Sequence, residues 1–256
     1  MDIHMDVSVA GGYKSSSQIA RVVSEAWVGK NLYCPRCGCD AIDHLKNNKP
    51  VADFQCPSCG NVFESKESSQ PIRRIVPDGV YDTMIRRIHE ADNPDFLFMY
   101  YDKSSWEVRD FLIVPRYYFC DSLIEKRSPL PPNARRAGWV GCNILLGEVP
   151  ASGRIPLIQD SVVLDKAGVT QKYKETSFMA EFHLRQRGWL VHMLQCLDAI
   201  EKQEFSLSDV YGFAGYLQRL HPENHHIEAK IRQQLQILRD KGVLEFVGRG
   251  SYRKRK

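Results

Sequence analysis

Apolar residues recur with the 3.6-residue period of an α-helix in the first part of the chain. Serines from Ser15 onward suit a helix N-terminus, and the apolar positions after them fall on one face: Ile19, Val22, Val23, Ala26 and Trp27. A second helix is predicted over Asp78–Ala91, where three apolar side chains point inward: Met84, Ile85 and Ile88. Both patterns are typical of helices that pack one face against a core.

Beyond these helices, apolar residues form continuous runs instead. Phe96–Tyr101 and Phe111–Val114 are rich in aromatic and β-branched residues, and Ile155–Ile158 is a shorter apolar run. Such runs predict buried strands. Strands mixed with helices indicate an α/β or α+β first domain.

The C-terminal part has three helical patterns in succession, followed by two strand-like segments. The predicted helices are Gly188–Lys202, Leu207–Leu220 and Asn224–Lys241. After them, Val243–Val247 and Ser251–Arg253 flank a Gly-Arg-Gly turn. Three helices followed by a β-hairpin are the order of elements in a winged helix-turn-helix. We therefore expect two domains, residues 1–182 and 183–256, with the linker near residues 172–185.

The composition excludes a membrane-spanning protein. Of 256 residues, 43% are hydrophobic and 26% are charged, as in ordinary globular proteins. No apolar run approaches the ~18 residues of a membrane span, and the N-terminus lacks the pattern of a signal peptide, so a cytoplasmic location is expected. Within the net charge of +4, residues 183–256 carry +5 and residues 1–182 carry −1. A basic end at Arg253–Lys256 favours a nucleic-acid partner, although such ends also occur as solubilising tails.

Four cysteines lie in two matched segments, Cys34-Pro-Arg-Cys37-Gly and Cys56-Pro-Ser-Cys59-Gly. Each segment predicts a tight turn that points two thiolates at one point, and its glycine permits a left-handed backbone. Together they supply the four sulfurs of a structural Zn²⁺ site, and the 18 residues between the two pairs suit such a site. Four sulfurs leave no open coordination position, so the zinc is expected to stabilise a hairpin. Buried thiols or a redox pair are the alternative, and Cys39 is close enough to compete as a ligand.

Three residues around the second cysteine pair match the PD-(D/E)xK pattern of nucleases, with Ala52 in place of the proline: Asp53, Glu64 and Lys66. If Val62–Lys66 is a strand, Glu64 and Lys66 project from the same face, because side chains alternate. Two carboxylates can hold Mg²⁺ beside a scissile phosphate, while a lysine orients or deprotonates the attacking water and offsets phosphate charge. The pattern is short enough to arise by chance, and a surface strand with an ion pair is the alternative.

The last predicted helix has a polar face suited to the major groove of DNA. Its buried stripe is Ile227, Ile231, Leu235 and Leu238. On the opposite side and its flank lie side chains that pair with adenine or guanine: Arg232, Gln233, Gln236 and Arg239. Arg249 in the glycine turn and Arg253 in the basic end suit phosphate contacts. A solvated helix face is the alternative.

A second candidate for DNA contact follows the proline-rich loop Ser128–Asn133. The segment Ala134–Asn143 contains Arg135, Arg136 and Trp139. Two arginines and an indole in a loop suit phosphate contact together with stacking on a base or apolar contact with a base methyl group. The alternative places Trp139 in the core and the arginines on the surface.

Four longer stretches show a resemblance to a known family: Asn47–Phe54, Ala134–Asn143, Ile231–Lys241 and Gly248–Lys254. On these residues the chain resembles the DpnI family of methyladenine-dependent restriction endonucleases along nearly its whole length. The first dozen residues, Cys39 and the Arg255-Lys256 end differ from the family. The resemblance implies an α/β fold of the PD-(D/E)xK nuclease type with a four-cysteine zinc-knuckle insertion, followed by a winged helix-turn-helix domain.

The resemblance also implies a reaction, namely Mg²⁺-dependent cleavage of double-stranded DNA to blunt ends at GATC sites that carry N6-methyladenine. The family's catalytic residues correspond to Asp53, Glu64 and Lys66, and its methyladenine reader corresponds to Trp139. The expected cofactors are Mg²⁺, held by Asp53 and Glu64, and structural Zn²⁺. A monomer is expected to bind DNA through the following residues: Arg135, Arg136, Trp139, Asn143, Arg232, Gln233, Gln236, Arg239, Arg249 and Arg253.

Two other functions stay open at this point. One is a zinc-ribbon and winged-helix regulator that binds DNA without cutting it. The set of Asp53, Glu64 and Lys66 distinguishes the two, because a pure binder has no need of it. The other is a related nuclease with a different site or methyl preference, since few substitutions in a reading loop can change specificity.

Overall fold

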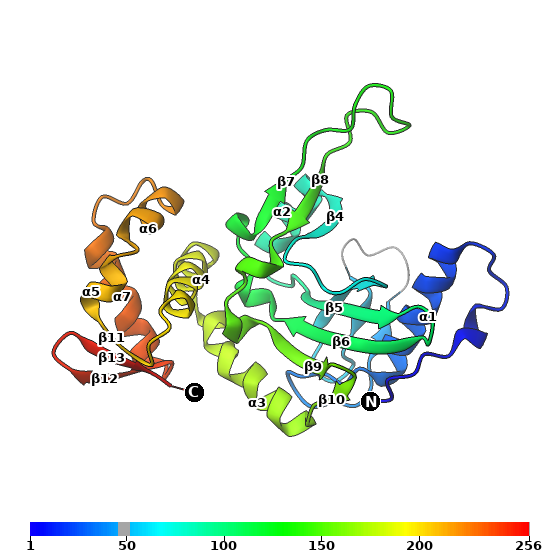
Figure 1. Ribbon diagram of the computed structural model, residues 1–256, viewed down its shortest axis with the longest axis horizontal. Coiled ribbons are helices and arrows are strands. Elements are labelled where there is room, and N and C mark those ends of the chain that lie inside the picture. Colours follow the sequence, from blue (N-terminus) through cyan, green and yellow to red (C-terminus); the bar gives the residue numbers. More distant parts are fainter. Residues whose placement is uncertain (46–51, 256) are drawn as a thin grey trace.

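The computed structural model describes residues 1–45 and 52–255, which form a mixed α/β part followed by a smaller helical part (Figure 1). Two features named above fall partly outside the described residues. These are Asn47–Val51 of the first family-like stretch and Lys256 of the basic end. Within the described residues, no helix is long and apolar enough to cross a membrane.

A seven-stranded sheet forms the centre of the α/β part, with the strand order β1-β2-β3-β5-β6-β9-β10. β3 (Val62–Ser68) runs parallel to β5 (Asp95–Asp102), and β5 is antiparallel to β6 (Glu107–Val114). The other strands are β1 (Asp43–His44), β2 (Phe54–Gln55), β9 (Ile155–Gln159) and β10 (Val162–Val163). All the buried strands predicted from apolar runs are confirmed, because β5, β6 and β9 form the middle of this sheet.

Helices α1 (Ser16–Asn31) and α3 (Lys166–Thr176) pack against one face of the sheet. Trp27 of α1 meets Phe111 of β6 edge to face, with ring centroids 5.4 Å apart. The predicted apolar face of α1 is only partly correct, because Ala26 is exposed whereas Val28 is fully buried. Large side chains decide which way a helix turns toward the core, since burial stabilises them more than it stabilises an alanine. The serine hydroxyl of Ser15 also makes no capping hydrogen bond.

A second, three-stranded sheet lies beside the opposite face, in the order β4-β8-β7. Its strands are β4 (Val76–Val80), β7 (Ile124–Lys126) and β8 (Gly141–Ile144), with α2 (Tyr81–His89) packed against them. The helix predicted over Asp78–Ala91 is wrong at both ends, because α2 begins at Tyr81 and ends at His89. Residues 76–80 pair with β8 as a strand, so the helix begins only at Tyr81.

Short 3-10 helices connect these elements: η1 (Val7–Ala10), η2 (Arg116–Tyr118), η3 (Asp121–Leu123), η4 (Leu146–Glu148), η5 (Ala151–Gly153) and η6 (Ser177–Glu181). Between β7 and β8 the chain leaves the body as a long arm, residues 127–140, which projects from the second sheet in Figure 1. The arm carries Arg135, Arg136 and Trp139.

The C-terminal part contains four helices and a three-stranded sheet in the order β11-β13-β12. Its elements are α4 (Leu184–Ala199), β11 (Glu204–Ser206), α5 (Leu207–Tyr211), α6 (Ala214–Leu220), α7 (Ile227–Asp240), β12 (Leu244–Gly248) and β13 (Ser251–Lys254). The predicted hairpin and last helix are confirmed. The predicted helix Leu207–Leu220 is interrupted at Gly212-Phe213, and the first predicted helix begins four residues earlier, at Leu184.

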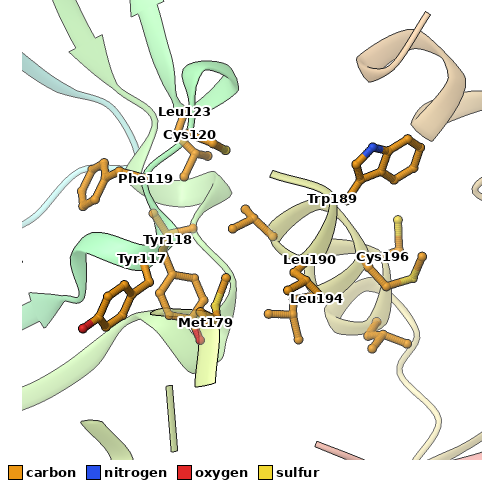
Figure 2. Packing of buried hydrophobic residues seen from close by; sticks show 14 of the residues in the cluster. Tyr117, Tyr118, Phe119, Cys120, Leu123, Met179, Trp189, Leu190, Leu194 and Cys196 are labelled. Carbon is orange, nitrogen blue, oxygen red and sulfur yellow. The ribbon is translucent and has the colours of Figure 1, made fainter. Parts of the chain in front are cut away.

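Helix α4 lies between the two parts of the chain (Figure 1). Figure 2 shows its buried Leu190 and Leu194 on the side toward the segment 117–123 of the α/β part, whereas the Trp189 ring points away from that segment and stacks on His221. The linker predicted near residues 172–185 is wrong at its start, because the chain through Thr176 belongs to α3. Tyr173 in this polar-looking stretch is buried, and its hydroxyl donates a hydrogen bond to Asp95 at 2.6 Å.

Candidate functional site

The two cysteine segments fold into the same turn. In the first, the Gly38 amide donates to the Cys34 carbonyl at 2.8 Å, and in the second the Gly60 amide donates to the Cys56 carbonyl at 2.9 Å. Gly38 and Gly60 have φ values of 79° and 69°, the left-handed region that side chains disfavour. The predicted role of the glycines is thus confirmed, and each turn presents two thiols to the other turn.

The four thiols of Cys34, Cys37, Cys56 and Cys59 gather with all ligand atoms within 4.8 Å of one another. The sulfurs of Cys34 and Cys59 are 3.6 Å apart, as are those of Cys37 and Cys56. Bonds of 2.3 Å to a tetrahedral Zn²⁺ place two sulfurs roughly 3.8 Å apart, so the set fits a structural zinc. Among the described residues, this is the only group of three or more His, Cys, Asp or Glu side chains with such spacing, and it leaves Cys39 out.

A buried polar network, which the sequence did not predict, connects the second cysteine segment, Cys56–Gly60, to the sheet. Asp95, fully buried at the start of β5, accepts hydrogen bonds from the Asn61 amide group at 2.6 Å and the Arg116 backbone at 2.8 Å. The Arg116 guanidinium donates to the Asn61 side chain at 2.6 Å. A buried carboxylate is tolerated when it is paired and hydrogen-bonded in this way. The network fixes the zinc hairpin next to the strand that follows it, β3.

Strand β3 places Glu64 and Lys66 on one face, as predicted, with the Lys66 ammonium 2.7 Å from the Glu64 carboxylate. Asp53 precedes β2, and its Oδ2 accepts a hydrogen bond from the backbone amide of Ser65 at 2.8 Å. The carboxylate of Asp53 is therefore anchored at the backbone between the two other residues. The structure brings together the three residues of the sequence pattern.

The two carboxylates are chemically suited to a hard divalent cation. One oxygen of Asp53 is held by Ser65 and one oxygen of Glu64 is held by Lys66. The second oxygen of each carboxylate makes no hydrogen bond to any residue in the described part of the chain. Carboxylate oxygens of this kind are the ligands that Mg²⁺ prefers, with water or phosphate completing its shell.

The pKa values of Glu64 and Lys66 both depart strongly from their ordinary values. Burial raises the pKa of Glu64 to about 7, and the negative charge of Asp53 adds to this effect while Lys66 opposes it. Burial by itself lowers the pKa of Lys66, but the adjacent carboxylates outweigh it and raise the pKa above its ordinary value. Lys66 is therefore an ammonium ion at neutral pH. Titratable groups with such shifts are concentrated at functional sites.

A fourth residue, Asp78 of β4, belongs to this cluster and was missed from the sequence. Its Oδ1 lies 2.7 Å from the Lys66 ammonium, so the lysine is held by two carboxylates. Asp78 lies outside the nuclease pattern, and the sequence had placed it at the start of a helix. Only the pairing of β4 with β8 brings it to the site.

The candidate DNA contacts in and after the arm between β7 and β8 differ in exposure. Arg135 and Arg136 are exposed, and the Arg136 guanidinium lies 5.1 Å from the Trp139 ring centroid. Trp139 is half-buried at the base of the arm, and its indole nitrogen has no hydrogen-bond partner among the described residues. Asn143, in β8, donates to Glu125 at 2.7 Å and so is already engaged.

Helix α7 has the two faces that its sequence predicts. The apolar stripe is buried, and the polar side chains are exposed: Arg232, Gln233, Gln236 and Arg239. Arg232 contacts the Tyr211 hydroxyl, and Gln233 accepts from Lys230 at 2.7 Å. At the hairpin, Arg249 is exposed in the turn, whereas Arg253 pairs with Glu204 at 2.6 Å and with Glu245 at 3.5 Å. Phosphate contact by Arg253 thus requires competition with two carboxylates.

Two family models match successive segments of the chain. The family model described as DpnI, Dam-replacing family, matches residues 1–182. The model described as DpnI_C, Dam-replacing HTH domain, matches residues 185–254. The chain belongs to the Dam-replacing family, which is a family of methylation-dependent restriction enzymes, and it carries that family's helix-turn-helix domain.

Proposed function

We propose that this protein is a type II restriction endonuclease that cleaves double-stranded DNA at GATC sites containing N6-methyladenine and leaves blunt ends. The observation that carries the proposal is the cluster on β3, where Glu64 and Lys66 share one face and Asp53 is anchored at the backbone between them. Family membership supports it, because a nuclease needs such a cluster and a DNA-binding regulator does not.

Residues 1–182, with the PD-(D/E)xK nuclease fold, provide cleavage in this proposal, and the zinc bound by the four thiols stabilises the hairpin that carries Asp53. Asp53 and Glu64 hold Mg²⁺, which stabilises the charge that develops on the scissile phosphate. Lys66 remains an ammonium ion, donates a hydrogen bond to the attacking water or phosphate oxygen, and offsets negative charge. Its raised pKa supports this electrostatic role over that of a general base.

Recognition is divided between two surfaces. Trp139 contacts the methyl group of the modified adenine, while Arg135 and Arg136 contact phosphates. Residues 183–256 bind DNA as a winged helix-turn-helix, with Gln233, Gln236 and their flanking arginines in the major groove. The exposed polar face of α7 and the net charge of +5 over these residues support this role.

The test is cleavage of one plasmid in two forms, with and without N6-methyladenine at its GATC sites. With Mg²⁺ present, discrete blunt-ended fragments are expected from the methylated form alone. Asp53→Ala is expected to abolish cleavage while retaining DNA binding, and Asp43→Ala, an exposed carboxylate of β1, serves as the matched control. Trp139→Ala is expected to reduce the preference for methylated DNA.

Each other outcome identifies a different function. Equal cleavage of both plasmids would support the nuclease activity and contradict the preference for methylated DNA. Robust cleavage by Asp53→Ala rejects the assigned site. Binding without cleavage by zinc-loaded, folded protein identifies a zinc-ribbon regulator.

A further inference from the structure

The ammonium group of Lys66 lies between carboxylates from two different sheets. Glu64 precedes it on β3 of the central sheet, and Asp78 approaches from β4 of the second sheet, each 2.7 Å from Nζ. All three side chains are largely buried, with 18% exposure for Lys66, 12% for Glu64 and 11% for Asp78. A buried, charge-assisted contact of this length restricts a flexible lysine to one position.

The two carboxylates differ in what else they do. Glu64 is also a proposed ligand of Mg²⁺, so its oxygens serve two cations. Asp78 contacts Lys66 and makes no other side-chain hydrogen bond within the described part of the chain. Among the described residues, the Asp78 carboxylate therefore has Lys66 as its one side-chain hydrogen-bond partner.

Asp78 is also close to the arm that carries Trp139. β4 pairs with β8 in a register that places Asp78 opposite Cys142, and the register shifts between Asp78 and Val80. β8 begins at Gly141, immediately after the arm, and the Tyr81 amide donates to the Val140 carbonyl at 3.2 Å. The base of the arm and the strand that carries Asp78 are thus parts of one hydrogen-bonded sheet.

At Gly141 the backbone of β8 lies in close contact with both the Trp139 ring and β4. A Cβ atom at Gly141 would lie 2.6 Å from the Trp139 ring and 3.4 Å from the Asp78 carbonyl oxygen. The indole therefore packs directly on the backbone of β8, next to the backbone of Asp78. This steric contact ties the position of the Trp139 ring to that of the β8 backbone.

From this geometry we propose that Asp78 is a positioning residue for Lys66 and that it couples the arm to the cleavage site. DNA that engages Trp139 fixes the start of β8, β8 fixes β4, and Asp78 then holds the lysine at the place where phosphate is cleaved. The inference rests on the proposed function and adds to it a physical route from recognition to catalysis.

The experiment compares Asp78→Ala and Asp78→Asn with Asp82→Ala, an exposed carboxylate four residues away in α2. Single-turnover cleavage of methylated DNA and metal-free DNA affinity are measured for each folded, zinc-loaded variant. Asp78→Ala is expected to slow cleavage by about tenfold to a hundredfold, the effect of a misplaced catalytic group, with the Kd unchanged or lower. Asp78→Asn, which keeps the acceptor oxygen, is expected to recover part of the rate.

A double-mutant cycle with Trp139→Ala tests the coupling. If Asp78 transmits the position of the arm, the effect of Trp139→Ala on the saturated cleavage rate is smaller in the Asp78→Ala background than in the wild type. Additive effects on the rate overturn the coupling. Wild-type rates in Asp78→Ala overturn the positioning role.

A readout independent of cleavage is the ¹H–¹⁵N signal of the Lys66 ammonium in metal-free protein, assigned by its loss in Lys66→Met. Slow exchange in the wild type and fast exchange in Asp78→Ala support the inference, and identical signals contradict it. If the wild type fails to cut any DNA, the proposed function fails, and this signal still decides whether Asp78 holds Lys66.

Discussion

At the scale of single residues, Glu64 combines two properties that conflict in an isolated side chain. It is a carboxylate, which favours water, and its strand leaves only 12% of its side chain exposed. Burial therefore raises its pKa to about 7, despite the adjacent ammonium of Lys66. In the proposed role of Glu64 as a ligand of Mg²⁺, the metal would therefore compete with a proton near neutral pH.

The affinity of the protein for Mg²⁺ should consequently depend on pH. Below pH 7 a proton must leave Glu64 before the metal binds, so the affinity is expected to rise about tenfold per unit as pH increases to 7 and to level off above it. Calorimetric Mg²⁺ titrations of zinc-loaded protein at pH 6, 7 and 8 measure this. Glu64→Gln should bind Mg²⁺ weakly at every pH, and a pH-independent wild-type affinity would contradict the prediction.

At the scale of elements, the zinc hairpin is a small unit built from two copies of one turn. Its strands β1 and β2 contain two residues each, too few to be stable alone. Burial raises the pKa of Cys56 to about 11, so this thiol is protonated at neutral pH unless a metal displaces the proton. The four sulfurs and the Asp95 network together hold the hairpin against the sheet.

Removing one sulfur should therefore affect far more than the hairpin. Cys37→Ser is expected to lose bound zinc, to reduce the free energy of unfolding by about 4 kcal/mol or more, and to abolish cleavage because Asp53 loses its support. Cys39→Ser, the neighbouring cysteine outside the thiol group, is the matched control and should keep one zinc per chain. Elemental analysis measures the zinc, thermal unfolding the stability and plasmid digestion the cleavage, and zinc retention by Cys37→Ser would refute the ligand set.

At the scale of the whole molecule, a chain of hydrogen bonds links the α/β part to the C-terminal part through α4. Ser122 lies 2.7 Å from the Nε2 atom of His192, and the Nδ1 atom of His192 lies 2.8 Å from His221. The indole of Trp189 stacks on His221 with centroids 3.5 Å apart. Burial lowers the pKa of both histidines to about 4. The charge of His221 lowers the pKa of His192 further, and the charges of Lys230 and Arg185 lower the pKa of His221 further.

The two histidines should therefore contribute less to the stability of the fold in acid. Between pH 6.5 and pH 4 the unfolded chain binds protons at both histidines and the folded protein does not, so these two groups make the free energy of unfolding fall as pH decreases, while the raised pKa of Glu64 acts in the opposite direction. His221→Asn should reduce this slope, whereas His225→Asn, at an exposed position, should leave it unchanged. Urea unfolding at pH 7, 6 and 5 measures the slopes, and equal slopes in all three proteins would exclude the histidine pair as their source.

The sequence by itself determined the features that depend on neighbours along the chain. Alternating side chains placed Glu64 and Lys66 on one face of a strand, repeated Cys-x-x-Cys-Gly turns defined the four-thiol group, and helical periodicity defined the buried stripe of α7. These features are set by local geometry, which one strand, turn or helix already contains.

Only the tertiary structure decided which separate elements meet. Residues 76–80 form a strand because β8 supplies their hydrogen-bond partners, and this pairing brings Asp78 to Lys66 from outside the sequence pattern. Likewise, Asp95 and Tyr173 are 78 positions apart and share one buried hydrogen bond. Such contacts depend on the packing of distant segments, and no local period or spacing encodes them.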